Sequence, residues 1–347
     1  MRLEVRNKGV YCESSIDSLV GTQSPLVSTQ SSVLGPQSML LSPHHLLMRI
    51  ADITYSIISV DPCLKLHIDE ASQEFLIHEI NPPWPIGHPR IPPCSPDVTI
   101  EARWDDLSVN VTNGKKIFDR GSTWKLYQQN GCYLFSFHSP LIGSIPYKEL
   151  HIQKDFSRGE VTLHSPYFNS EQPIYPLEYP LDELIFIHFL SLGRGVEIHS
   201  CGVIDSSGNG YLFPGQSGAG KSTTARLWQD EPGITILNDD RIVLRKVDGK
   251  VWMYGTPWHG DAKLASPARA PLTAVYLLRH GQKNELIPQR RTEALSRLFS
   301  CSFLPFYNKE ALDFTLAFFE EVVKVMPCYE LRFLPNKEAV EFIQKES

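Results

Sequence analysis

Residues 211–228 read Tyr211-Leu212-Phe213-Pro214-Gly215-Gln216-Ser217-Gly218-Ala219-Gly220-Lys221-Ser222-Thr223-Thr224-Ala225-Arg226-Leu227-Trp228. The run begins as a short apolar strand and ends as the start of a helix. Between them, residues 215–222, here called the glycine loop, match G-x-x-x-x-G-K-[ST]. Strand, loop and helix come in the order that phosphate binding requires. A glycine-rich turn that matches by chance is the alternative.

The glycine loop has the chemistry of a phosphate cradle. Glycines let backbone amides face a ligand, and these amides bind phosphate oxygens together with the positive end of the helix. Lys221 is expected to reach the β- and γ-phosphates, and the Ser222 hydroxyl to ligate Mg²⁺. The sequence thus predicts ATP and Mg²⁺ as cofactors. The predicted nucleotide contacts are Gly215, Gln216, Ser217, Gly218, Ala219, Gly220, Lys221, Ser222 and Thr223.

The residues before the loop narrow the fold class. Residues 195–204 are strand-like, and 205–210 form a turn into the strand that precedes the loop. This spacing is too short for a crossover helix, so the two strands are expected to pair antiparallel. Most phosphate-loop proteins place a parallel strand there, and a mixed sheet is predicted here instead.

Two acids follow the next predicted strand, residues 234–237, in the sequence Asn238-Asp239-Asp240. Phosphoryl transfer uses one carboxylate to hold Mg²⁺ and another to accept the proton of the acceptor hydroxyl. Adjacent strand residues point to opposite faces, so the two aspartates are expected to have different roles. A solvent-exposed acidic turn is the alternative.

Three other places hold weaker candidates. His199 lies one strand before the loop, where it either approaches the γ-phosphate or is structural. His259 and Asp261 lie in a turn-rich stretch, 255–261, that either closes over a ligand or is a plain turn. Arg290-Arg291 could meet phosphate, although a solvated surface is the favoured interpretation.

These residues resemble the HPr kinase/phosphorylase family and its relatives, which share the phosphoenolpyruvate carboxykinase-type fold. The resemblance rests on His199, the hairpin, the glycine loop, and Asp239-Asp240 followed by Ile242-Val243. It covers roughly residues 180–265 and extends more weakly to the end.

The resemblance implies roles for these residues. Asp239 is similar to the family's proton acceptor, and Asp240 to the acid that joins Ser222 in the metal site. His199 matches the family's histidine before the loop, and with Lys221 it completes the predicted catalytic set.

One family signature is missing. The family carries Glu-Arg-Gly further on, whereas the comparable stretch here reads Trp252-Met253-Tyr254-Gly255-Thr256-Pro257-Trp258-His259-Gly260. The absent acid and arginine argue against HPr as the substrate and against phosphorylase activity. The chain is more similar to the HPr kinase-like proteins found beside peptide-modification genes, some of which phosphorylate a peptide serine.

The pattern divides the chain into three parts. Residues 1–47 lack a hydrophobic period and are predicted to be a disordered or loosely attached tail. Residues 48–180 are predicted to form a β-rich N-terminal domain. Residues 181–347 are predicted to form an α/β P-loop kinase domain with a mixed sheet, of the type that the resemblance implies. We expect a chain that begins at Met48 to fold unchanged.

Individual elements can also be predicted. Asn113-Gly114 and Asn130-Gly131 are hairpin turns, and the proline-rich residues 78–97 read as a surface loop. Helices are expected over 181–192 and 310–325. The apolar stripe of the second helix is Leu312, Leu316, Phe319 and Val323.

Composition excludes several classes. The net charge of −6 argues against a nucleic-acid binder. No apolar segment approaches the roughly 20 residues that span a bilayer, and no signal peptide is recognisable. Seven cysteines without a C-x-x-C pair favour reduced thiols in a cytoplasmic protein. Homo-oligomer formation stays open.

The sequence favours an ATP-dependent kinase that phosphorylates a hydroxyl, of serine in a protein or peptide, or of a small molecule. A carboxykinase-like transfer to a small acid is one alternative, although the chain is short for it. A nucleotide-binding adaptor or ATPase without phosphotransfer is the other. The N-terminal domain would either recognise the substrate or only stabilise the fold or an oligomer.

Overall fold

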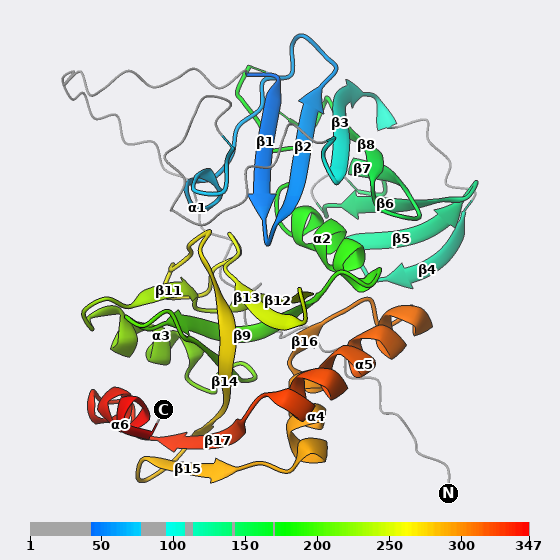
Figure 1. Ribbon diagram of the computed structural model, residues 1–347. Coiled ribbons are helices and arrows are strands. Elements are labelled where there is room, and N and C mark those ends of the chain that lie inside the picture. The colour runs from blue at the N-terminus through cyan, green and yellow to red at the C-terminus, as the bar shows by residue number, and fades with distance from the viewer. Residues whose placement is uncertain (1–42, 78–94, 108–113, 141–142, 169–170, 347) are drawn as a thin grey trace, which may run out of the picture.

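The chain folds as an α/β protein with two mixed sheets. Figure 1 shows one sheet above the other, with helix α2 (Leu181–Ser191) near their junction. The predicted tail and proline-rich loop lie largely outside the described residues, as does Asn113 of the first predicted hairpin turn. The computed structural model describes residues 43–77, 95–107, 114–140, 143–168 and 171–346.

The first sheet has eight strands in the order β1-β2-β3-β8-β7-β6-β5-β4. The hairpin predicted at Asn130-Gly131 is confirmed, because these residues join β5 to β6 with φ values of 49° and 81°. A two-residue type I′ turn requires positive φ at both positions. The strands are β1 (His45–Ile50), β2 (Ile53–Ser59), β3 (Val98–Asp105), β4 (Lys115–Asp119), β5 (Trp124–Gln129), β6 (Cys132–His138), β7 (Pro146–Gln153) and β8 (Arg158–His164), with a short helix α1 (Glu70–Gln73).

The second sheet has nine strands, and its main order is β10-β9-β12-β13-β14-β17-β15. The antiparallel hairpin predicted before the glycine loop is confirmed as β9–β10, and β10 pairs in parallel with β14 on its other edge. The strands are β9 (Val196–Ile204), β10 (Gly210–Pro214), β11 (Thr235–Asn238), β12 (Arg241–Val247), β13 (Lys250–Tyr254), β14 (Arg269–His280), β15 (Glu285–Pro288), β16 (Ser302–Phe303) and β17 (Cys328–Phe333).

Side-chain alternation gives this second sheet two buried faces. On β10, Leu212 packs in one core, whereas Tyr211 and Phe213 pack in the other. Helices α4 (Arg291–Ser300) and α5 (Lys309–Val325) cover the first face. Helices α3 (Lys221–Gln229) and α6 (Glu338–Glu346) cover the second. Burial on both faces explains why residues 211–213 are continuously apolar.

Helix α2 belongs to the core of the first sheet. Every residue from Leu181 to Leu190 is buried, and its apolar side chains join the cluster that fills the eight-stranded sheet. A helix that is apolar all round requires burial on all sides. The boundary predicted between residues 180 and 181 therefore separates this helix from the sheet that packs on it.

The helix predicted over 310–325 is α5, but its buried stripe is rotated. Phe319 and Val323 are buried as predicted, whereas Leu316 is 42% exposed. The small residues Ala311 and Thr315 are buried instead, on the helix that packs against α4. Small side chains let two helix backbones approach closely, and a search for large apolar residues overlooks them.

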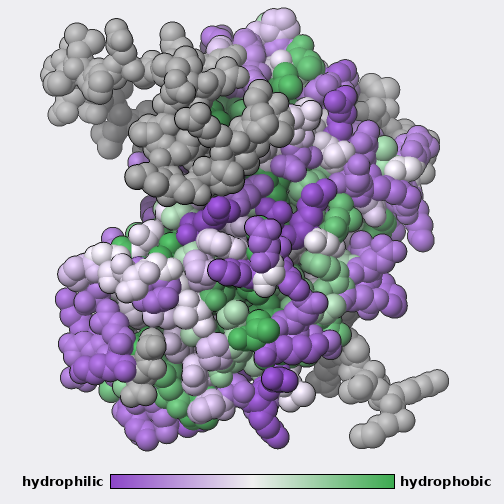
Figure 2. Space-filling view, viewed as in Figure 1, coloured by the Kyte–Doolittle hydropathy of each residue, from purple (hydrophilic) through white to green (hydrophobic). Residues whose placement is uncertain are grey.

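Hydrophobic residues lie in small separate groups on the face shown in Figure 2. Exposed large apolar side chains are likewise scattered, from Val60 to Leu334. In the described parts of the chain, no helix has both the length and the hydropathy needed to cross a bilayer.

The ordered fold begins before Met48, where the sequence pattern placed its start. β1 begins at His45, and its second residue, Leu46, is buried. The amide of Ser59 donates a hydrogen bond of 2.8 Å to the carbonyl oxygen of His44. The residues just before Met48 therefore pair with and pack on the eight-stranded sheet.

A variant truncated to begin at Met48 is expected to be less stable than one that begins at Pro43, because only the second keeps Leu46 and the hydrogen bond of His44. Burying a leucine contributes about 1.5–3 kcal/mol, and about 1 kcal/mol shifts the thermal midpoint by about 2–4 °C in chains of this order of size. Thermal unfolding should therefore show a midpoint lower by about 4 °C or more for the shorter variant. Equal midpoints would mean that the first half of β1 adds nothing.

Candidate functional site

The glycine loop turns β10 into α3. Gly218 and Gly220 have φ values of 80° and 104°, where a side chain strains the backbone. A Cβ on Gly220 would also lie 2.9 Å from Cζ of Phe333 on β17. The loop therefore bends sharply into the N-terminus of α3, where free amides favour an anion.

Lys221 opens α3, and its side chain is only 5% exposed. Its ammonium lies 3.4 Å from the carbonyl oxygen of Gln216 and 3.7 Å from Oδ1 of Asp240. A buried charge needs partners of this kind. Lys221 thus lies between the loop and a carboxylate, where it can contact a phosphate oxygen.

Asp239 is completely buried, at 0% exposure. Its Oδ2 accepts hydrogen bonds of 2.8 Å from Ser222 Oγ and 2.9 Å from the amide of Ala262. Its Oδ1 accepts one of 2.9 Å from the amide of Gly260. Both oxygens are therefore engaged, and Asp239 ties the start of α3 to residues 260–262.

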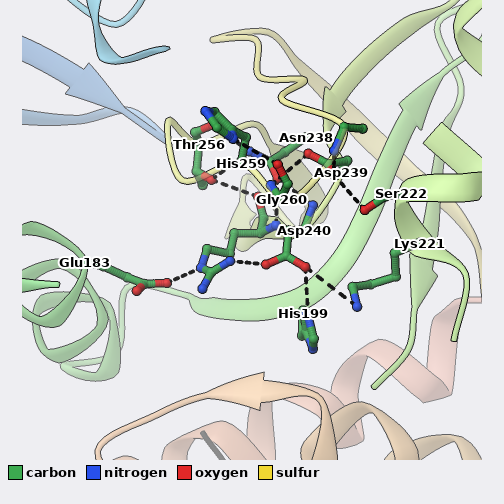
Figure 3. Close-up of polar contacts among 12 residues, drawn as sticks. Glu183, His199, Lys221, Ser222, Asn238, Asp239, Asp240, Thr256, His259 and Gly260 are labelled. Atoms are coloured by element: carbon green, nitrogen blue, oxygen red, sulfur yellow. Dashed lines mark hydrogen bonds and ion pairs between the residues drawn. The ribbon is translucent and has the colours of Figure 1, made fainter. Parts of the chain in front are cut away.

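Asp240 points elsewhere (Figure 3). His199 Nε2 donates a hydrogen bond of 2.8 Å to its Oδ1, and the guanidinium of Arg241 binds its Oδ2. Burial raises the pKa of Asp240, but the His199 hydrogen bond and the charges of Arg241 and Lys221 outweigh this and lower it to about 2. Asp240 is therefore an ionised carboxylate at neutral pH.

The two aspartates have different surroundings, as their adjacency predicts. Asp239, expected to accept a proton, is enclosed and already accepts three hydrogen bonds. Asp240, expected at the metal, lines a cavity that Ser222 and Lys221 also line. The cause is local: the Asn238 side chain accepts from the amides of Asp240 and Arg241 and turns the chain between the two acids.

The cavity lies between the two sheets and has a volume of about 700 Å³. Its second wall comes from the eight-stranded sheet and from α2, which the sequence did not associate with the site. This wall includes Arg120, Trp124, His138, Tyr147, Tyr179 and Leu184.

Two further charged residues of the site were not found from the sequence. The Arg241 side chain bridges Asp240 and Glu183, the latter from the first turn of α2. The available signal was an acidic pair, Asp182-Glu183, at the start of a helix that is otherwise almost wholly apolar. Buried acids of this kind need partners.

Some of the weaker candidate residues line the cavity and others do not. His199 and Asp261 line the cavity, and the carbonyl of Asp261 accepts a hydrogen bond of 3.1 Å from Arg226. His259 bonds the carbonyl of Gly260 and is not among the cavity residues. Arg290 is highly exposed and pairs with Glu293, as expected for a solvated surface.

Oxygen ligands for Mg²⁺ come from the loop and the acids. Within the described residues, no three His, Cys, Asp or Glu side chains gather into a metal site. Mg²⁺ that binds with a nucleotide takes only one or two protein ligands and keeps water and phosphate oxygens for the rest. Ser222 Oγ, held by Asp239, fits that requirement, and the carboxylate of Asp240 lines the same cavity.

No protein-family model matches the chain, and no curated protein matches it either. What this site does therefore has to be argued from its own geometry.

Replacing Asp239 by Asn should destabilise the fold. An amide side chain has one acceptor oxygen, so the amide of Gly260 or Ala262 would lose its partner. An unsatisfied buried donor costs about 1–3 kcal/mol. Urea unfolding should show this loss. The matched control is Asp261→Asn on the same loop, whose exposed side chain predicts a change within about 0.5 kcal/mol. Equal stability of both variants would contradict the contacts described for Asp239.

Proposed function

We propose that this chain is an ATP-dependent kinase that transfers the γ-phosphate to a hydroxyl of a protein, peptide or small molecule. The observation that carries the proposal is that the glycine loop, Lys221 and the ionised Asp240 converge on one cavity. Phosphoryl transfer needs an amide cradle, a cation on the phosphates and an acid beside the acceptor hydroxyl. ATP and Mg²⁺ are the proposed cofactors.

In this proposal Asp240, rather than Asp239, orients the acceptor hydroxyl and receives its proton. A carboxylate with a pKa of about 2 is a weak base. The transition state of phosphoryl transfer is loose, however, so a correctly placed charge matters more than basicity. Lys221 and the loop amides bind the phosphates. Bound Mg²⁺ would neutralise their charge, with Ser222 as its ligand and Asp239 fixing that hydroxyl.

The proposed acceptor side is the wall from the eight-stranded sheet. An acceptor hydroxyl has to approach Asp240 from the space that the loop does not occupy. Trp124, Tyr147 and Tyr179 face that space, together with the polar residues Arg120 and His138. This supports a role for the N-terminal half of the chain in holding the acceptor.

The geometry also supports the proposed kinship with HPr kinase-like proteins. His199, Ser222 and Asp240, which carry part of that resemblance, line one cavity. A cytoplasmic location is proposed as well, and Cys63, Cys201 and the other described cysteines are free thiols.

Lys221→Ala should weaken MgATP binding about 10- to 100-fold, since a hydrogen bond to a charged group contributes about 1.5–3 kcal/mol. Titration calorimetry with MgATP measures this directly. Lys246→Ala is the matched control, because Lys246 is half-exposed, does not line the cavity and forms its ion pair with the equally exposed Glu321. MgATP binding that is equally tight in both variants would refute the nucleotide site.

Asp240→Asn should keep MgATP affinity within about threefold but lower phosphotransfer about 10²- to 10⁴-fold, the usual contribution of a positioned acid or base. Radiolabelled γ-phosphate followed into candidate acceptors, and into free phosphate, measures transfer and hydrolysis separately. A wild-type chain that binds MgATP but transfers to no acceptor would favour the adaptor. Full activity of the Asp240→Asn variant would contradict this role for Asp240 and favour Asp239 as the proton acceptor.

A further inference from the structure

The first turn of α2 places two acids between the sheets. Asp182 and Glu183 are both buried, on a helix that packs in the core of the eight-stranded sheet. A buried carboxylate is costly unless it is paired. Each of the two binds a side chain from the C-terminal half of the chain, Arg241 at the start of β12 or Trp258 between β13 and β14. Each of these partners is connected to one aspartate of the site.

The first connection runs through Arg241. Its Nε binds Glu183, and its Nη1 binds Asp240. The guanidinium also lies over the Phe303 ring, 5.1 Å from its centroid. A planar, rigid fork fixes the position of each carboxylate that it binds. The carboxylate of Asp240 is thus held between His199 on one side and an arginine anchored to α2 on the other.

The charges agree with this arrangement. Glu197 lies on β9 next to the same cluster, and burial raises its pKa well above the usual value, with the charge of Glu183 raising it further. Both effects favour the neutral form of Glu197. Within the described residues, Arg241 forms ion pairs with both Glu183 and Asp240 and so links the two acids.

The second connection runs through Trp258. Its indole Nε1 donates a hydrogen bond of 3.0 Å to Asp182, and its ring packs 5.2 Å from that of Phe186 on α2. Trp258 therefore belongs to the core of the first sheet, although its chain segment belongs to the second. Gly260 and Ala262, two and four residues further along the chain, supply the two amides that hold Asp239.

We propose that Asp182 and Glu183 are positioning residues through which the eight-stranded sheet sets the geometry of both site aspartates. Glu183 places Asp240 through Arg241, and Asp182 places Asp239 through Trp258. The N-terminal half of the chain would then control phosphotransfer itself, in addition to holding an acceptor. This inference rests on the proposed kinase function.

The two connections predict different effects, and MgATP is the probe for both. Glu183→Gln keeps the volume but removes the charge that anchors Arg241. It should lower the turnover number for MgATP hydrolysis or transfer about 10- to 100-fold, because misplacement of a reacting group by about 1 Å has an effect of this order. MgATP affinity should stay within about twofold. Trp258→Phe keeps the ring but removes the N–H, and should raise the Mg²⁺ concentration needed for half-maximal binding or activity.

Asp52→Asn is the matched control. Asp52 also pairs across the two sheets, with Arg269 and Tyr254, but none of these three residues lines the cavity. If the cross-sheet contacts serve only to dock the sheets, Asp52→Asn should impair activity as much as Glu183→Gln. If the proposal holds, Asp52→Asn keeps wild-type turnover and Mg²⁺ dependence.

Hydrogen exchange gives a readout that is independent of activity. Glu183→Gln should speed exchange at the amides of Asp240 and Arg241, and Trp258→Phe at those of Gly260 and Ala262. Exchange in β14 and β17 should not change in either variant. Wild-type local exchange in both variants, or equal loss of turnover in Asp52→Asn, overturns the inference. Failure of the wild-type chain to bind MgATP would instead refute the kinase proposal and leave the exchange result to decide the positioning roles.

Discussion

A guanidinium that is almost fully buried has to be compensated by carboxylates, and Arg241 meets that requirement with one acid from each half of the molecule. Glu183 comes from the helix that fills the eight-stranded sheet, and Asp240 comes from the turn that enters β12. Removing either acid would leave a buried charge without its full compensation, which is far more costly than the pair itself is stabilising. The position of Asp240, which lines the cavity, therefore depends on contact between the two sheets.

Much of the fold around the glycine loop could be predicted because local signals determine it. The apolar strand, the glycines with positive φ and the short turn at 205–210 allow few alternatives, and β9, β10 and α3 follow. The stripe of α5 could not be predicted as well. Which side of that helix is buried depends on its neighbour α4, and Thr315 carries no apolar signal of its own.

The residues of the candidate site could likewise be predicted only in part. Sequence spacing identified Lys221, Ser222, His199 and the acid pair, which the structure brings within hydrogen-bonding or ion-pair reach of one another. The distinction between the two aspartates depends on residues 260–262 and on a side-chain bond from Asn238, and neither is visible in a one-dimensional pattern. Glu183 was missed because the acidic pair at the start of α2 shows that these acids need partners, but not that the partner is Arg241 on the other sheet.

The contact between Gly220 and Phe333 has a consequence for the order of events during synthesis. β17, which carries Phe333, is made long after the glycine loop has left the ribosome, and β14 can gain that parallel neighbour only then. The strands of the first sheet and α2 are complete much earlier, and early parts of a chain commonly fold first. A nascent chain would then present α2 with its acids still exposed and its phosphate cradle unsupported, so chaperones would meet an unfinished second sheet beside a finished first one.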